Sequence, residues 1–591
     1  MKLRKNKKII NYIFIIFLIL SSTILFNNKT IEKEKITNNK LKALEQEGQS
    51  YRLVTSADNV QVPVPKGYVA SQATGENYVT PEYQHTINTY KVESTPTELT
   101  WSSPDGEQYP WTQDSNGIWI SGNQRIPSSE SVLESEEFNY VKGTTLTINY
   151  TYSSANNDFL NIYIINLANN MAQRIIYNKY GNTDTSFDYT TSNYTYTMND
   201  WGTGRYKIRA TYSKNASANA GQDSAYIKTS TYYKKDENGT ETFEEDIKTK
   251  IHDGGFVIYQ LTDEELETDP NGTGVIINDT NKDIAQSIRN QYVWVPVPNI
   301  EDIVRTKVVN NGIIQFGQIY IFSTTSITKE TNTGTNYYRE PRLVEQCDII
   351  KYYLQRYSNI DKRASYLNKM QENYGRMIKS INKYKGFYIG RYETGDDYEH
   401  DSNKKCFINP RVVRYNQNIN YVTWYDSYDK LKRLAGKTGK YVETGMIYDS
   451  LWDYTLKWIN ETDARSYEEI GSDGKSWGNY YNNINKYKES SNGTEIIKNA
   501  GSDSIIPTGG IIEITYEGEI YSDFPSSSDN IFDIAGNVSE WTSSKYSDNY
   551  RGGRGDIYNI SSSNSPAKSF SGSSPIGSVG NRETRSVLLV R

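Results

Sequence analysis

The residues most able to do chemistry lie in one short stretch near the C-terminal end of the sequence. Gly536 and Asn537 both tolerate a positive φ, so the chain can reverse tightly there. Such a turn would bring the amide of Asn537 and the carboxylate of Glu540 into one small volume. Two hard oxygen ligands at this spacing suit Ca²⁺, which also accepts backbone carbonyls and water. The alternative is a Gly-Asn hairpin turn with an outward-facing glutamate, which spacing alone favours.

The wider pattern around this turn resembles a known signature. Residues 530–542 read N-x-x-D-x-x-G-N-V-x-E-W-T, and Arg551-Gly552-Gly553 follows. The pattern is similar to that of the formylglycine-generating enzyme (sulfatase-modifying factor) superfamily, a variant of the C-type lectin fold. The resemblance implies a structural Ca²⁺ held by Asn537, Glu540 and the backbone carbonyl of Val538.

The catalytic members of that superfamily carry two cysteines a few residues beyond R-G-G. With copper, these activate O₂ and oxidise a substrate cysteine to formylglycine. Residues 554–591 contain no cysteine, so both the soft ligand that selects Cu(I) and the redox nucleophile are missing. We therefore predict a non-catalytic member, with no catalytic residues and no copper. Cys347 and Cys406 lie far upstream, and in an exported chain they could form one disulfide.

Composition limits the remaining function classes. A chain of 591 residues exceeds one compact core, and about 150 residues per domain allows three or four domains. Its 65 basic and 71 acidic side chains are balanced, which leaves no footprint for a nucleic acid partner. The three histidines lie far apart, so no zinc-ligand spacing exists. The 51 tyrosines fit either a binding surface or a strand-rich fold.

The N-terminal end predicts export. Residues 1–8 are mostly basic and residues 9–26 are almost entirely apolar, which is typical of an export signal. The apolar run approaches the ~20 residues that span a bilayer, and no small-residue cleavage site follows it. We expect residues 1–30 to be a membrane anchor or a signal peptide. The rest of the chain is then extracellular, either anchored at the cell surface or secreted.

Residues 31–84 read as a stalk and first connector, and an inserted domain follows over 85–252. Within it, short runs of alternating apolar and polar residues, such as Leu146-Thr147-Ile148, are separated by polar turns. This spacing predicts an antiparallel β-sandwich. Three tryptophans there are either a glycan-stacking platform or, more commonly, core residues: Trp101, Trp111 and Trp119.

Two valine-proline runs flank the inserted domain. They lie at 62–65 and 295–298, and alternating prolines favour edge strands or extended connectors. We expect residues 61–80 and 253–300 to form one layer that the insertion splits.

The C-terminal part adds helices. Residues 253–379 read as a connector and helical lead-in, and residues 380–591 as the formylglycine-generating-enzyme-like domain. Thr423 is predicted to cap one helix that ends near Gly436. A second helix is expected over about 446–459, with Thr444 as its cap. The expected fold class is therefore α+β: a C-terminal formylglycine-generating-enzyme-like (C-type lectin-like) domain with an N-terminal antiparallel β-sandwich domain.

The segment from Ser543 to Phe570 is rich in Tyr, Asn, Ser and Gly. Such composition makes adaptable polar contacts around rigid aromatic anchors, although a low-complexity surface loop has the same composition. In lectin-like relatives on this superfamily fold, the segment around R-G-G is the ligand-binding face. The resemblance thus implies five ligand-binding residues: Tyr546, Asn549, Tyr550, Tyr558 and Asn559.

The sequence as a whole favours a surface-anchored, non-enzymatic binding protein. Its lectin-like head would engage a protein or glycan partner, and the membrane would be reached through residues 9–26. Two alternatives stay open. One is a formylglycine-generating oxidase acting on exported sulfatases, and the other is a structural cell-envelope protein.

Overall fold

The computed structural model describes most of the chain from Ser50 onward. The described ranges are 50–168, 171–181, 193–197, 202–216, 220–309, 312–331, 360–396, 407, 409–414, 422–474, 477–480, 485–489, 494–498, 505, 508–509, 511–516, 519–521, 527–546, 550–555, 557–561, 563–564, 566–575 and 582–591. The predicted anchor, both cysteines and Asn549 lie outside them. Among the described helices, none is both long and apolar enough to span a bilayer.

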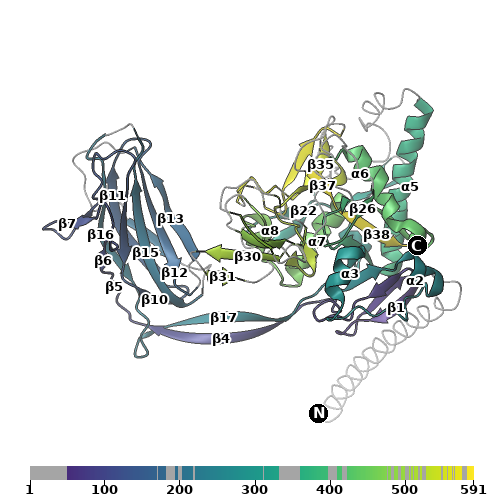
Figure 1. Cartoon of the computed structure of the whole chain (residues 1–591), viewed down its shortest axis with the longest axis horizontal. Helices are drawn as coiled ribbons and strands as arrows, with labels where there is room; N and C mark the ends of the chain where they lie inside the picture. The colour runs from purple at the N-terminus through teal and green to yellow at the C-terminus, as the bar shows by residue number, and fades with distance from the viewer. Residues whose placement is uncertain are drawn as a thin grey trace, which may run out of the picture.

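The fold is a β-rich α+β fold. Strands account for 41% and helices for 17% of the structure, and nearly all strand pairs are antiparallel. Figure 1 shows two bodies joined by a long two-stranded ribbon. We call residues 93–240 the two-sheet unit, and residues 50–81 together with 253–591 the α+β unit.

Two six-stranded sheets form the two-sheet unit, seen on the left of Figure 1. One contains β6 (Trp101–Ser102), β9 (Glu130–Ser135), β10 (Phe138–Tyr140), β12 (Phe159–Asn166), β13 (Met171–Lys179) and β15 (Gly204–Ser213). The other contains β5 (Thr97–Glu98), β7 (Thr112–Gln113), β8 (Trp119–Ile120), β11 (Thr145–Ser153), β14 (Asn193–Thr197) and β16 (Ser224–Tyr232). One hydrophobic core joins both sheets.

The predicted alternation explains that core. On β11, Leu146 and Ile148 are fully buried while Thr147 between them is only half-buried. Trp101 and Trp111 belong to the same core, 9% and 3% exposed. These two tryptophans are therefore core residues rather than an exposed glycan-stacking platform.

The ribbon consists of β4 (Glu82–Val92) and β17 (Glu241–His252), paired antiparallel along their length. The chain leaves the α+β unit through β4 and returns through β17. At the base of the ribbon, Lys248 pairs with Asp463 at 2.5 Å. The rings of Tyr78 and His252 also stack there, with centroids 3.5 Å apart.

A six-stranded sheet organises the α+β unit. Its order is β27 (Val442–Met446), β38 (Ser586–Val590), β24 (Gly386–Gly390), β19 (Gln291–Pro296), β18 (Val257–Gln260) and β3 (Tyr68–Ala70). Because β3 pairs with β18 and β18 with β19, residues from 61–80 and 253–300 lie in one sheet, as expected. Tyr388 and Ile389 on β24 point into separate clusters, so both faces of the sheet are covered.

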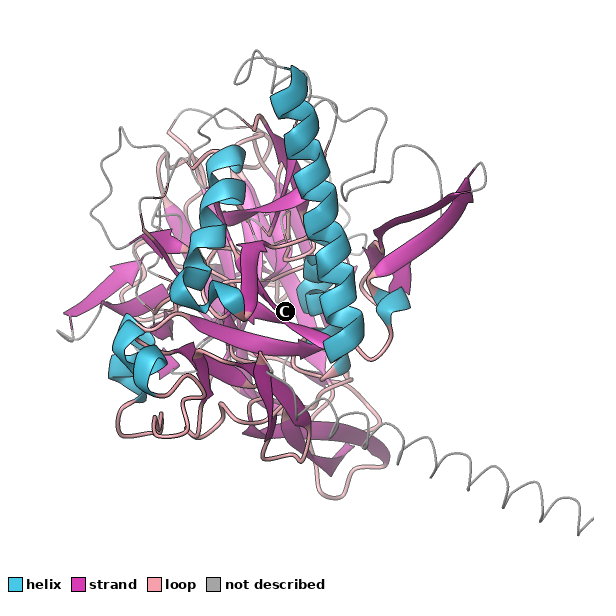
Figure 2. Ribbon diagram, turned by 90° about the vertical axis from the view of Figure 1, so that its right-hand side faces the viewer, coloured by secondary structure: helices cyan, strands magenta, loops and turns pink. Residues whose placement is uncertain are grey.

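Helices flank this sheet. Figure 2 shows the long helix α5 (Ile360–Tyr384), which contacts β24 and β38. The other helices in the described part of the chain are α2 (Asp263–Thr268), α3 (Lys282–Ile288), α6 (Trp424–Lys430), α7 (Asp449–Glu461), α8 (Tyr467–Gly471), η1 (Ile300–Asp302) and η3 (Leu431–Lys440). Thr423 caps α6 as predicted, accepting from the Asp426 amide. Gly436, with φ of 47°, breaks the helical path within η3.

One predicted cap is wrong. Thr444 lies in strand β27 opposite Leu588, and α7 begins at Asp449. The Thr444 hydroxyl instead donates to the Leu431 carbonyl at 2.8 Å and accepts from the Ala435 amide at 3.1 Å. The strand pairing therefore overrides the helical pattern that begins at Met446.

The remaining strands form short ladders around these elements. They are β1 (Tyr51–Thr55), β2 (Gln61–Pro65), β20 (Val304–Val309), β21 (Gly312–Gly317), β22 (Tyr320–Phe322), β23 (Ile327–Lys329), β25 (Gly395–Asp396), β26 (Pro410–Arg411), β28 (Asn485–Glu489), β29 (Thr494–Lys498), β30 (Ile511–Tyr516), β31 (Glu519–Tyr521), β32 (Ser527–Ser528), β33 (Ile531–Phe532), β34 (Ser539–Lys545), β35 (Arg551–Arg554), β36 (Phe570–Ser573) and β37 (Arg582–Thr584). Strands β34 to β37 carry the candidate site.

Candidate functional site

The Gly536-Asn537 turn has the conformation expected from its sequence. Both residues have a positive φ, 70° and 56° respectively. Gly536 forms a parallel bridge with Asn479, and a Cβ at Gly536 would collide with the Asn479 carbonyl. The Asn537 amide then donates to that carbonyl at 2.9 Å. Only glycine fits at this point, because another backbone passes directly against it.

The Asn537 side chain lies in the protein interior. Its Nδ2 donates to Glu393 Oε2 at 2.7 Å, and its Oδ1 accepts from Asn479 Nδ2 at 3.0 Å. Asn537 is fully buried and Val538 is 1% exposed. The predicted turn therefore faces inward, so the alternative with an outward-facing glutamate does not describe this structure.

Glu540 is held by an arginine. It lies on β34, fully buried, and accepts from Arg585 Nε at 3.1 Å through each carboxylate oxygen. Arg585 Nη2 also lies 2.5 Å from Glu540 Oε1. The same guanidinium donates to the Gly390 carbonyl at 2.9 Å and the Phe532 carbonyl at 2.8 Å. Arg585 thus ties β24, β33 and β34 together at one buried point.

Further carboxylates surround this ion pair. Burial raises the pKa of Glu393 well above its usual range, and the nearby charges of Asp533 and Glu583 raise it further. Asp533 accepts from the Thr508 hydroxyl and the Gly509 amide, both at 2.8 Å. Burial also raises the pKa of Glu540, which the Arg585 guanidinium opposes. The buried carboxyl of Glu393 is therefore inclined to hold a proton.

The contacts of Asn537 and Glu540 bear on how a calcium ion would fit. A carboxylate that already accepts two guanidinium nitrogens is a poor ligand, because a nearby cation repels a second one. Among the residues described, no set of three or more His, Cys, Asp or Glu side chains is arranged to hold a metal. The donor set at Asn537, Val538 and Glu540 therefore fits Ca²⁺ poorly, and calcium binding stays a prediction.

Trp541 forms the base of the site, as its position in the motif suggests. It is fully buried, and its Nε1 donates to the Val422 carbonyl at 3.0 Å. The Arg582 guanidinium lies 4.7 Å from its ring centroid. Gly553, on the neighbouring strand β35, leaves room for that guanidinium, since a Cβ there would collide with Arg582. Close packing of the Arg582 guanidinium therefore explains the second glycine of R-G-G, Gly553.

The five predicted ligand-binding residues separate into two groups. Tyr546 and Tyr550 are 49% and 46% exposed and close the β34–β35 hairpin, where the Tyr546 amide donates to the Tyr550 carbonyl at 3.1 Å. Tyr558 is half-buried and its amide donates to the Asn537 carbonyl at 3.0 Å. Asn559 is exposed beside it. Asn549 lies outside the described residues.

Sequence reasoning missed the buried arginines. Arg585 stands in the run Arg585-Ser586-Val587-Leu588-Leu589, where a charge opens an otherwise buried strand. Arg554, 1% exposed, pairs with Asp453 and lies 3.4 Å from Asp449 on α7. For Arg585, a charge at the start of an apolar run was the available signal. The glycine-rich, charged surroundings of Arg554 offered no such signal.

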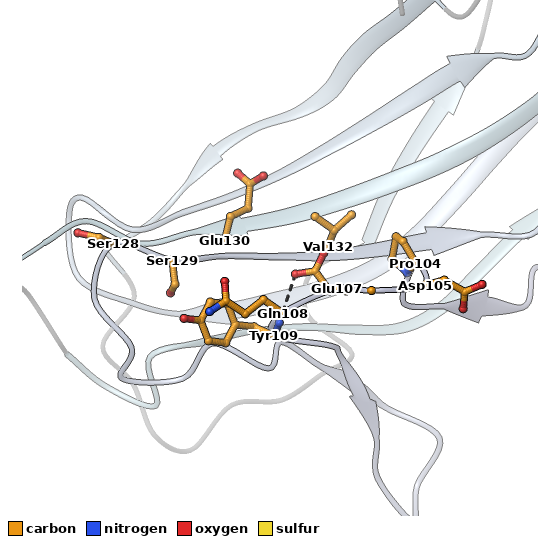
Figure 3. A pocket seen from close by; sticks show the side chains of 10 residues that line it. Pro104, Asp105, Glu107, Gln108, Tyr109, Ser128, Ser129, Glu130 and Val132 are labelled. Carbon is orange, nitrogen blue, oxygen red and sulfur yellow. Dashed lines mark hydrogen bonds between the residues drawn. The ribbon is translucent and has the colours of Figure 1, made fainter.

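The two-sheet unit has a pocket of its own. It is an open cavity of about 430 Å³. Figure 3 shows its lining, which includes Asp105, Glu107, Tyr109 and Glu130. The Tyr109 amide donates to Glu107 Oε1 at 3.4 Å, which fixes part of the loop. Carboxylates beside an aromatic ring can accept hydroxyl hydrogen bonds and stack against an apolar face.

No protein-family model matches the chain, and no curated protein matches it in sequence. Solved structures similar to parts of it include the following two. PvdO from Pseudomonas aeruginosa is 15% identical, covering 35% of this chain and 81% of its own, with a TM-score of 0.22. CBM86, a low-affinity xylan-binding module from Roseburia intestinalis, is 9% identical, covering 26% of this chain and 96% of its own, with a TM-score of 0.15. Both TM-scores are too low to carry an argument about this chain.

Proposed function

We propose that this chain is a surface-anchored, non-enzymatic binding protein whose α+β unit engages a protein or glycan partner through the β34–β35 hairpin. The α+β unit would be a non-catalytic relative of the formylglycine-generating enzymes, and residues 9–26 would attach it to a membrane. The single observation that carries the proposal is the exposure of Tyr546 and Tyr550 side by side at the hairpin tip.

Few tyrosines in the described part of the chain are as exposed as these two. Among the described residues, four tyrosines expose more than a third of their surface: Tyr180, Tyr467, Tyr546 and Tyr550. Two of the four close this one hairpin. The Tyr546 ring packs against Phe570 at 5.2 Å between centroids, so it is partly fixed before any ligand arrives. Rigid aromatic side chains lose little entropy on binding, which favours them as anchors.

The burial of the carboxylates near the hairpin favours a structural role for them over a catalytic one. Glu393, Glu540 and Glu583 are fully buried, and Asp533 is 2% exposed. A ligand at the surface does not reach these carboxylates, whereas a general acid or base must lie within hydrogen-bond reach of its substrate. Binding through surface side chains is therefore the function that this geometry supports best.

A binding screen tests the proposal. The full chain would be applied to a glycan microarray and to a panel of cell-surface proteins, and each hit measured with Tyr546→Ala and Tyr550→Ala variants. Loss of one central tyrosine should weaken binding at least about tenfold. Tyr467→Ala, which removes a tyrosine on α8 that is 40% exposed, is the matched control. Unchanged affinity in both hairpin variants would show that the proposed face is wrong.

The oxidase alternative has its own test. The full chain would be incubated with copper and a cysteine-containing sulfatase peptide, and the peptide analysed by mass spectrometry. The binding proposal expects no conversion of cysteine to formylglycine.

The pocket in Figure 3 favours a second binding role for the two-sheet unit. Tyr109 is half-exposed, and Asp105 and Glu107 line the same cavity. Acceptors beside a ring suit a polyol such as a sugar. Affinity electrophoresis in soluble polysaccharides would test this role, with Tyr109→Ala expected to abolish any retardation that the Tyr550→Ala variant keeps.

A further inference from the structure

A basic groove lies on the α+β unit, and none of its lining residues belongs to the β34–β35 hairpin. It is about 460 Å³ in volume and runs between α5 and strands β27 and β38. We define the basic groove by its charged lining: Arg376, Lys379, Lys383, Arg591 and Glu443. Its floor is apolar, formed by the mostly buried side chains of Tyr384, Leu589 and Val590. Four cationic side chains and one side-chain carboxylate meet here, in a chain whose net charge is −6.

The two lysines are the cations that a ligand can recruit. Glu443 already pairs with Arg376, accepting from its Nε at 2.7 Å and its Nη2 at 3.0 Å. Lys379 and Lys383 lie one helical turn apart on α5, so they share one face. Both are exposed, and within the described residues neither forms an ion pair. Two ammonium groups over an apolar floor suit a phosphate group with an attached hydrocarbon.

Charges around the rim of the groove cancel one another. Lys369 on α5 and Lys432 on η3 add two cations beyond the groove, and Glu372 and Asp429 add two carboxylates. These four charges balance one another. The excess of positive charge therefore comes from the basic groove itself.

The basic groove adjoins the point where the described chain begins. The Ser50 hydroxyl donates to the Arg591 backbone oxygen at 2.5 Å, and the Tyr384 hydroxyl donates to the same oxygen at 2.5 Å. The Tyr51 and Tyr384 rings contact each other edge to face, with centroids 5.0 Å apart. The described chain therefore begins at this end of the groove, with 23 residues between it and the apolar run 9–26.

We propose that the basic groove docks onto the anionic headgroup layer of the lipid membrane that the N-terminal segment enters. The proposal rests on the membrane attachment proposed above, and it adds a second contact that orients the α+β unit. Residues 27–49 separate the apolar run from Ser50, and 23 residues reach at most about 80 Å when fully extended. A tether no longer than this keeps the headgroups at a high effective concentration near the groove, so weak contacts suffice.

Charge complementarity sets the expected effect. Each lysine close to an anionic bilayer raises the affinity of the protein for that bilayer about fivefold. High salt screens this electrostatic contribution. Lys379 and Lys383 should therefore become inaccessible on anionic membranes and stay accessible on neutral ones. The dependence on lipid charge separates docking of the groove from insertion of the apolar segment, which does not need anionic lipid.

Lysine footprinting on vesicles tests the proposal. The full chain would be reconstituted with phosphatidylcholine vesicles, with or without phosphatidylglycerol, acetylated with an amine-reactive reagent and analysed by mass spectrometry. Modification of Lys379 and Lys383 should slow at least about fivefold only in the anionic vesicles, and high salt should restore it. Lys228, exposed on β16 of the two-sheet unit, should react equally in all vesicles.

Variants and a soluble probe complete the test. In a Lys379→Glu/Lys383→Glu double variant, the rim lysines Lys369 and Lys432 should react equally in anionic and neutral vesicles. A Lys228→Glu/Lys234→Glu variant should instead behave as the native chain. Equal protection of the two lysines by soluble glycerol phosphate would assign a small-anion site and overturn membrane docking. Equal reactivity of both lysines in the two vesicle types would also overturn it. Vesicle flotation reports separately whether residues 9–26 attach the chain.

Discussion

Replacing Arg585 by methionine should destabilise the α+β unit strongly, because it leaves a carboxylate buried without its partner. Arg585 and Glu540 are both fully buried and joined through two guanidinium nitrogens. Breaking such a pair by removing one partner costs about 3–5 kcal/mol. The carbonyls of Gly390 and Phe532 lose a donor as well, each contributing about 1 kcal/mol. The expected loss in the free energy of unfolding is about 5–7 kcal/mol.

Differential scanning calorimetry of the full chain measures this effect. At about 2 °C per kcal/mol for a large domain, the transition of the α+β unit should fall by roughly 10 °C or more. The transition of the two-sheet unit should not move. Adding Glu540→Leu to Arg585→Met removes both charges, and most of the lost stability should return because apolar residues can replace a buried pair.

Arg289→Met is the matched control. Arg289 also binds a glutamate through two nitrogens, to Glu265 at 2.6 and 2.8 Å, but that pair is partly solvated. Its loss should cost about 1 kcal/mol or less. A second experiment repeats the calorimetry with added calcium and with a chelator. An ion bound at Glu540 would raise the transition temperature by mass action. A transition that falls on chelation, together with a harmless Arg585→Met, would refute the reasoning.

Three further predictions follow from the buried groups. Burial raises the pKa of Asp529 from 3.8 to about 7, so the folded state loses stability progressively as the pH rises from about 4 to 7. Asp529→Asn should therefore increase the free energy of unfolding at pH 8 by roughly 2–4 kcal/mol. Denaturant titrations should also show a weaker dependence of stability on pH. Gly536→Ala should cost at least about 2 kcal/mol from its positive φ and the Asn479 carbonyl, whereas Gly445→Ala, with open space, should stay within about 1 kcal/mol; equal losses would contradict this. Glu393→Gln should stay within about 1 kcal/mol at neutral pH, because burial already favours the protonated carboxyl, and a loss like that of Arg585→Met would show that Glu393 is charged.

The sequence indicated much of the fold through periodicity. Alternation at Leu146 and Ile148 predicted the strand β11, and the cap at Thr423 predicted the start of α6. The joint layer of residues 61–80 and 253–300 was also predicted, and the pairing of β3 with β18 confirms it. Local patterns suffice in these places because each strand or helix buries one face. The local pattern gives the wrong prediction at Thr444, because this residue pairs with β38, a strand more than 140 residues later in the sequence.

The candidate site was predictable only in part. The motif located the turn, and the positive φ of Gly536 and Asn537 agrees with the residue types. The partner of Glu540 could not be read from the motif, because Arg585 lies 45 residues away and meets it only through the pairing of β34 with β37. The exposure of Tyr546 could not be predicted either. It depends on which face of the hairpin the rest of the fold covers, and composition does not decide that.

Arginine recurs where distant segments of this fold meet. Arg391, 3% exposed, donates to Glu76 at 2.8 Å across 315 residues of sequence, and Arg585 reaches Glu540, Gly390 and Phe532. Arg554 connects β35 to α7 through Asp453 in the same way. A guanidinium offers five donors in a fixed plane, so one side chain can join three segments as an ion with several oxygen ligands would. Unlike an ion, it is encoded in the chain, and the stability it confers should therefore be insensitive to chelators and to external calcium.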